Sequence, residues 1–142
     1  MSSDCSVTSL NCSLFIANSQ LDKMIIAVDF DGVLNASPYP EVGVVVAGAT
    51  RAMRELYEAG HTLIIWTCRE GQDQTNAINF LLQNGIPFNG INCNTQTNIE
   101  RYSNDCRKVH ADLYVDDHQV GGFPGWDEVL RWVDCVSISN NE

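Results

Sequence analysis

Basic residues are scarce in this chain. Its 142 residues include 8 Lys and Arg against 18 Asp and Glu, which gives a formal net charge of -10. Proteins that bind nucleic-acid backbones need clustered Lys and Arg to neutralise the phosphates. The composition therefore argues against a general nucleic-acid-binding protein, and only a local basic strip would leave that function open.

Long apolar runs are missing as well. Before Lys23 the chain has no Lys or Arg, and the longest apolar stretch of that region is Leu14–Ala17. A secretory signal needs a basic start and a longer apolar segment, and a membrane span needs about 20 apolar residues. We therefore expect a soluble, cytoplasmic protein that does not enter a membrane.

The six cysteines lack the close spacing of a metal or redox motif. They stand at positions 5, 12, 68, 93, 106 and 135, and no two form a Cys-X-X-Cys pair. Zinc ribbons and thioredoxin-type centres need such a pair. A cysteine-phosphatase loop is also excluded, because it needs an Arg six positions after the Cys, and Cys68 is followed there by Gln74.

Apolar runs alternate with helical patterns from Met24 onward. We predict strands at 24–28, 62–66, 88–93, 111–115 and 136–138, and helices at 49–58, 73–83 and 126–134. This alternation is typical of a parallel sheet with crossover helices. We expect an α/β fold: a single three-layer Rossmann-like domain at 23–142 with a mainly parallel central sheet. Residues 1–22 show no sustained period, and we interpret them as an N-terminal appendage.

Two aspartates follow the first predicted strand, in the tetrapeptide Asp29-Phe30-Asp31-Gly32. Residues i and i+2 of an extended segment point to the same side, so the two carboxylates can converge. Such a pair needs a cation or a shared proton, and a hard cation such as Mg²⁺ prefers oxygen ligands. A structural turn is the alternative. A calcium loop is excluded, because Pro40 stands where that loop needs a Glu.

Polar residues also follow later strands. Thr67 ends the strand at 62–66, Asp116 and Asp117 follow the strand at 111–115, and Lys108 precedes that last strand. Ligands of an open parallel sheet bind outside the carboxyl ends of its strands. We therefore expect these side chains to meet the first Asp pair at one edge of the fold.

Each of these residue types suits phosphate chemistry. Asp29 can attack a phosphate monoester, while Asp31 protonates the leaving alcohol and then deprotonates the attacking water. A threonine hydroxyl at 67 and an ammonium group at 108 can bind the phosphoryl oxygens. The Asp pair at 116 and 117 completes a hard-cation site with Asp29 and a backbone carbonyl near Asp31.

In this order the motifs resemble those of the haloacid dehalogenase superfamily of phosphohydrolases. The resemblance covers about residues 24–138 and rests on Asp29-Phe30-Asp31-Gly32-Val33, Ile64-Ile65-Trp66-Thr67, Lys108 and Val115-Asp116-Asp117. It implies a phosphatase with Asp29 as the phosphorylated nucleophile and Asp31 as acid and base. It also implies phosphate ligands at Thr67 and Lys108, with Arg107 as the alternative to Lys108. Magnesium would be held by Asp29, the backbone carbonyl of Asp31 and Asp116, with Asp117 assisting.

The chain leaves no room for the cap domain that members of this superfamily commonly carry. Only 35 residues separate Asp31 from Thr67 and 40 separate Thr67 from Lys108, and predicted elements already use both segments. The chain therefore resembles the capless subgroup, with at most a short flap at 35–46. An open site suits a bulky phosphorylated substrate, or else a second copy of the chain shields it in a homo-oligomer.

Three further residues are secondary candidates. Arg69 could bind a second anionic group of the substrate or form a surface ion pair, and Asn94 and His118 could contact the leaving group or serve only the structure. Two other functions stay open. A phospho-accepting receiver module uses similar groups, but in a different order along the chain. A polynucleotide phosphatase is disfavoured by the acidic composition.

Overall fold

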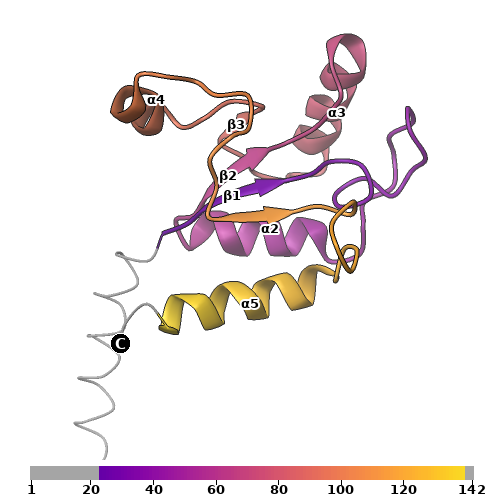
Figure 1. The fold of residues 1–142 in the computed structure, drawn as a ribbon. Coiled ribbons are helices and arrows are strands. Elements are labelled where there is room, and N and C mark those ends of the chain that lie inside the picture. Colours follow the sequence, from indigo (N-terminus) through magenta and orange to yellow (C-terminus); the bar gives the residue numbers. More distant parts are fainter. Residues whose placement is uncertain (1–22, 140–142) are drawn as a thin grey trace, which may run out of the picture.

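Four parallel strands form one central sheet. The computed structural model describes residues 23–139, so the predicted appendage at 1–22 lies outside the described residues. The strands are β1 (Ile25–Val28), β2 (Thr62–Ile65), β3 (Gly90–Ile91) and β4 (Leu113–Val115), in the order β3-β2-β1-β4 (Figure 1). This topology confirms the predicted α/β fold with a single Rossmann-like domain.

Helices connect the strands and follow the last one. They are α2 (Ala49–Glu58), α3 (Gly71–Gln83), α4 (Gln96–Tyr102) and α5 (Trp126–Ser139). Helices α2 and α5 lie side by side against one face of the sheet, whereas α4 stands on the opposite side (Figure 1). None of the helices in the described part of the chain combines the length and apolar character that a membrane crossing requires.

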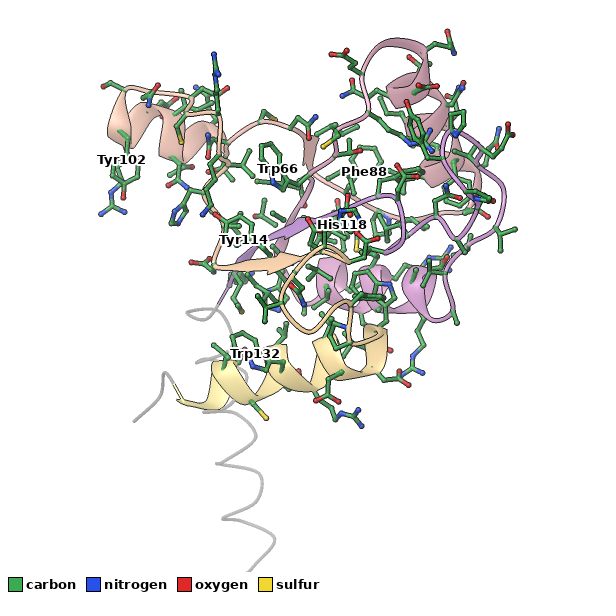
Figure 2. All side chains as sticks on the ribbon, turned by 45° about the vertical axis from the view of Figure 1, so that its right-hand side comes forward. Trp66, Phe88, Tyr102, Tyr114, His118 and Trp132 are labelled. Carbon is green, nitrogen blue, oxygen red and sulfur yellow. The ribbon has the colours of Figure 1, made fainter. Side chains whose placement is uncertain are left out.

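Side chains of the strands alternate between two apolar clusters. Ile26 and Val28 of β1 belong to the large cluster beneath α2 and α5, while Ala27 belongs to a small cluster with Ile64 and Val109. The segment before β4 therefore covers the second face, where Trp66 and Tyr114 also lie (Figure 2). Burial on both faces explains why the strands read as continuous apolar runs rather than alternating ones.

Two helical segments differ from the expectation. The predicted strand at 136–138 is wrong, because α5 continues to Ser139. Its Val129, Val133 and Val136 recur at helical spacing against the core, and this packing outweighs the strand preference of a short Val-Ser-Ile run. Helix α4 was not predicted, because it buries none of its residues and so has no apolar period.

No domain is inserted into the described residues between β1 and α2. Residues 29–48 contain only turns and isolated bridges, which pair Asp31 with Asn35 and Asn35 with Val45. The indole N–H of Trp126 donates to the carbonyl oxygen of Val33 at 2.8 Å in the core. This bond ties the loop after β1 to the start of α5, and residues 29–48 leave no room for an inserted domain, as the spacing predicted.

The register of the sheet aligns the strand ends. Val28 at the end of β1 pairs with Ile65 of β2 on one side and with Val115 of β4 on the other. Backbone bonds continue one residue further, from the N–H of Asp29 to the carbonyl of Val115 at 2.9 Å. The residues after these three strands therefore leave the sheet at the same level, which places the candidate groups at one edge.

Candidate functional site

Three carboxylates gather where β1 and β4 end. Asp29, Asp116 and Asp117 each offer an oxygen atom, and these atoms all lie within 4.8 Å of one another. All three side chains are partly buried. The structure therefore brings the first and fourth predicted motifs together, although they lie far apart in the sequence.

The acidic surroundings change the protonation of Asp29. Burial is the main cause that raises the pKa of its carboxyl group from 3.8 to about 8, followed by a hydrogen bond with Asp117 and the charge of Asp116. The N–H of Phe30 donates to Oδ1 of Asp29 at 2.8 Å and lowers the pKa, but less strongly. The cluster by itself therefore favours a neutral Asp29, whereas a bound cation would favour the ionised nucleophile.

Gly32 makes room for Asp117. Its φ is +81°, in the left-handed region, and a Cβ atom at this position would lie 2.2 Å from Oδ2 of Asp117. A side chain here would strain the backbone and displace the carboxylate. The glycine that ends the Asp-Phe-Asp-Gly motif is thus required for two reasons: the left-handed turn and the close approach of Asp117, which follows β4.

The donor set fits a hard divalent cation. Three carboxylates converge without His or Cys among them, and oxygen donors of this kind suit Mg²⁺ rather than zinc. Because Gly32 has no side chain, Asp117 can lie close to the turn that carries Asp29. Magnesium bound by Asp29, Asp116 and Asp117 is consistent with this geometry, and the backbone carbonyl of Asp31 as a further ligand stays a prediction.

Arg69 holds the carboxylate of Asp31. Its Nε donates to Oδ2 and its Nη2 to Oδ1, both at 2.8 Å. Arg69 is only 3% exposed, so the ion pair that the sequence suggested is present, but its arginine is buried and only the Asp31 side chain, 32% exposed, reaches the surface. Because this guanidinium is directed at Asp31 and nearby carbonyl groups, its predicted role as a substrate anion ligand has no support in this geometry.

Thr67 is fixed by a residue that the sequence analysis did not identify. The side chain of Asn92 accepts from the N–H of Thr67 and donates to its carbonyl oxygen, both at 2.8 Å. The hydroxyl oxygen of Thr67 accepts from the N–H of Arg69 at 3.1 Å. A hydroxyl group can accept this bond and still donate its own hydrogen, so phosphate binding by Thr67 stays a prediction.

Lys108 and Arg107 are both exposed. The ammonium group of Lys108 lies 5.2 Å from the centre of the Tyr114 ring, and among residues 23–139 no carboxylate lies within ion-pair distance of it. Lysine carries a compact charge on a flexible stem. The structure describes no contact of either residue with the acidic cluster, so phosphate binding by Lys108 or Arg107 stays a prediction.

The two secondary candidates have different surroundings. His118 is exposed at the end of β4 (Figure 2), where its N–H donates to Oδ1 of Asp116 at 2.8 Å. Asn94 is buried and joins two loops, because it donates to Asp105 at 2.8 Å and accepts from the N–H of His110 at 2.7 Å. His118 stays a candidate for substrate contact, whereas Asn94 has the structural role that was the alternative.

Asn35 is a further residue beside Asp31 that no sequence pattern indicated. This fully buried side chain donates to Oδ1 of Asp31 at 3.2 Å and to the carbonyl of Glu41 at 2.8 Å. Asn92 carries the same signal as Thr67, a polar residue after an apolar strand, and that pattern could have found it. Asn35 lies within the predicted flap, and no local pattern indicates that the chain turns back there.

Comparisons with known proteins give one informative match. No family model matches the chain, and a search of curated proteins also finds no match. A solved structure of a conserved protein from Bacteroides thetaiotaomicron is 34% identical in sequence, with a TM-score of 0.71. The match covers 79% of this chain and 90% of the Bacteroides chain. At this identity and coverage, the chain belongs to the same family as that conserved Bacteroides protein.

Proposed function

We propose that the chain is a magnesium-dependent phosphatase of the haloacid dehalogenase type, which hydrolyses a phosphate monoester through an aspartyl phosphate on Asp29. The observation that carries this proposal is the convergence of Asp29, Asp116 and Asp117 within 4.8 Å at the carboxyl end of the sheet. The carboxylate of Asp31 follows two residues after the nucleophile. Such an arrangement supplies a nucleophile, a proton carrier and a cation site in one place.

In the first step, a carboxylate oxygen of Asp29 attacks the phosphorus atom. The bond between phosphorus and the alcohol oxygen breaks, and Asp31 gives a proton to that oxygen as the alcohol leaves. Asp31 carries this proton only in the substrate complex, where one of its two oxygens gives up its contact with Arg69 to hold it. The hydroxyl of Thr67 can donate to a phosphoryl oxygen during this transfer. Magnesium, when bound, would offset the repulsion between the aspartate and the phosphate, both of which are negative.

In the second step, a water molecule attacks the phosphorus atom of the aspartyl phosphate. Asp31, now ionised, takes a proton from this water while the bond between phosphorus and the Asp29 oxygen breaks. Inorganic phosphate leaves, and both carboxyl groups return to their starting states. One residue thus serves as acid and then as base, which divides a difficult hydrolysis into two easier reactions.

The test compares phosphate release by the wild type and Asp29→Asn. A panel of phosphorylated metabolites, nucleotides and phosphopeptides is supplied with Mg²⁺, and Asp127→Asn serves as the matched control, because Asp127 is exposed in the first turn of α5. We expect Asp29→Asn to lose about 1,000-fold or more in kcat, as for other nucleophiles, and the control to keep the wild-type rate. Substantial turnover by Asp29→Asn would contradict the proposal.

The lifetime of the phosphorylated protein and its binding of oligonucleotides distinguish a metabolite phosphatase from the two other functions. A phosphatase should form an acyl phosphate that hydroxylamine cleaves and that turns over with the substrate. A phosphoprotein that persists for minutes without turnover would instead indicate a receiver module. Binding of oligonucleotides that weakens steeply with salt would indicate a polynucleotide phosphatase.

A further inference from the structure

The guanidinium group of Arg69 is almost completely withdrawn from water. Arg69 is 3% exposed, and its Cζ atom lies 5.0 Å from the ring centres of both Phe30 and Tyr39. A charge in such a place is costly unless hydrogen bonds and an opposite charge compensate it. The groups that Arg69 contacts therefore indicate which parts of the structure depend on this buried charge.

One half of these contacts fixes Asp31. Two parallel N–H groups of Arg69 reach the two carboxylate oxygens at 2.8 Å, which is the bidentate geometry that defines the plane of a carboxylate. The amide of Asn35 adds a third donor to Oδ1 at 3.2 Å. Asp31 is thus held in a single orientation by groups that arrive from two different segments.

The other half fixes the flap, residues 35–46. Nη1 of Arg69 donates to the carbonyl of Pro40 at 3.0 Å, and Nη2 donates to that of Glu41 at 3.3 Å. The hydroxyl of Tyr39 donates to Oδ2 of Asp73 near the start of α3 at 2.9 Å. The flap is therefore attached to β2's following loop and to α3 rather than standing free at the open edge.

We infer that Arg69 is a positioning residue that holds the flap and the proton-carrying carboxylate of Asp31 in one rigid unit. The inference rests on the proposed function, because Asp31 needs an orientation only if it moves protons. The unit fixes the second carboxyl group relative to the nucleophile. A single lysine ammonium cannot reproduce the planar, bidentate contact together with the carbonyl contacts.

The leaving group reveals whether Arg69 acts through Asp31. An alkyl phosphate such as glycerol 2-phosphate needs a proton from Asp31 as the alcohol departs, whereas p-nitrophenolate departs from p-nitrophenyl phosphate without one. The ratio kcat/KM reports the steps up to this departure. A misplaced Asp31 should therefore slow the alkyl substrate selectively, while a loss of folded protein slows both substrates equally.

The experiment compares Arg69→Lys with the wild type on both substrates. We expect kcat/KM to fall about 100-fold for glycerol 2-phosphate, the usual cost of a misplacement of about 1 Å, and much less for p-nitrophenyl phosphate. Arg51→Lys is the matched control, because Arg51 makes only an exposed pair with Glu55 on α2. Amide hydrogen exchange within residues 36–46 should also become faster in Arg69→Lys, and this readout does not depend on activity.

The inference would be overturned if Arg69→Lys lowered kcat/KM equally for both substrates. It would also be overturned if neither kcat/KM nor amide hydrogen exchange within residues 36–46 changed. If Arg69→Lys does not fold, Tyr39→Leu is measured by amide hydrogen exchange within residues 36–46, because Tyr39 is 64% exposed, its ring lies over Arg69 and its hydroxyl bonds Asp73. Faster exchange would support the hold on the flap, and unchanged exchange would overturn it. Turnover by Asp29→Asn at the wild-type rate would overturn the proposed function instead. In that case, amide hydrogen exchange within residues 36–46 still shows whether Arg69 holds the flap in place.

Discussion

At the scale of single residues, Asp29 combines a chemical role with a cost to stability. The folded protein raises the pKa of its carboxyl group from 3.8 to about 8. Between these two values the folded chain keeps a proton on Asp29 that the unfolded chain has released. The stability of the metal-free protein should therefore fall as the pH rises through this window.

Replacing Asp29 by Asn removes this dependence. We expect Asp29→Asn to be more stable than the wild type at pH 8 by about 1 to 2 kcal/mol, after a discount for the partial exposure of the carboxyl group. This corresponds to a rise of roughly 5 °C in Tm. Thermal unfolding in EDTA at pH 4, 6 and 8 measures the difference, which should shrink toward zero at pH 4. An advantage that grows at low pH would contradict the assignment of the pKa.

Gly32 provides a second prediction at this scale. A Cβ atom would approach Asp117 to 2.2 Å at Gly32, whereas Gly122 has nearly the same φ, +76°, with no atom within 4 Å. Both Gly32→Ala and Gly122→Ala should lose about 1 kcal/mol through backbone strain. Only Gly32→Ala should also weaken Mg²⁺ binding, by about 10-fold or more. Calorimetric titration measures the Mg²⁺ affinity of each variant. Equal affinities in the two variants would contradict the role of Gly32 in making room for Asp117.

At the scale of elements, a side chain between β2 and β3 extends the sheet toward the site. Beyond the last paired residues of these strands, Asn92 bonds both backbone groups of Thr67. At the opposite end of the same strands, Asn89 accepts from the N–H of Leu63 at 2.8 Å. Two asparagines thus clamp the short β3 to β2, but only one of them lies beside a candidate phosphate ligand.

This pair allows a matched test. Asn92→Gly keeps the left-handed backbone of a residue with a φ of +51° and removes its side chain, and Asn89→Ala is the control. Each variant should lose about 1 kcal/mol of unfolding free energy through its missing hydrogen bonds. Only Asn92→Gly should also lower kcat, by about 10-fold, because Thr67 loses its fixed position. A similar loss of kcat in both variants would indicate general loosening of the sheet instead.

At the scale of the whole molecule, the sheet carries an open edge between two differently covered faces. Helices α2, α3 and α5 contribute to the large cluster on one face, while a small cluster with Val109 packs on the other. No domain is inserted between β1 and α2 among the described residues, and the three carboxylates beyond β1 and β4 are partly buried. This arrangement supports the phosphatase proposal without indicating which phosphate ester is hydrolysed.

Much of this architecture follows from local patterns. Apolar runs predicted the four strands of the sheet, and the helix at 49–58 was predicted with the bounds that the structure has. The polar residues after strands led to Asp29, Thr67 and Asp116, because the ends of parallel strands share one edge. Helix α4 was missed because it has no apolar period. Apolar character alone also does not show which side chains face solvent: Trp132 of α5 is 50% exposed (Figure 2).

By itself, the sequence determined the succession of strands and helices along the chain, the lack of room for an inserted domain after β1 and the acidic character of the residues that follow β1 and β4, since these depend on composition and spacing. Only the tertiary structure decided the partners of those groups. Asp117 meets Gly32, and Arg69 meets Asp31 across 38 positions. Such contacts depend on the register of the sheet and on the return of the flap, and no local pattern encodes where two distant segments meet. For the same reason, the sequence left two roles open for Arg69, and only the structure showed that it is buried against Asp31.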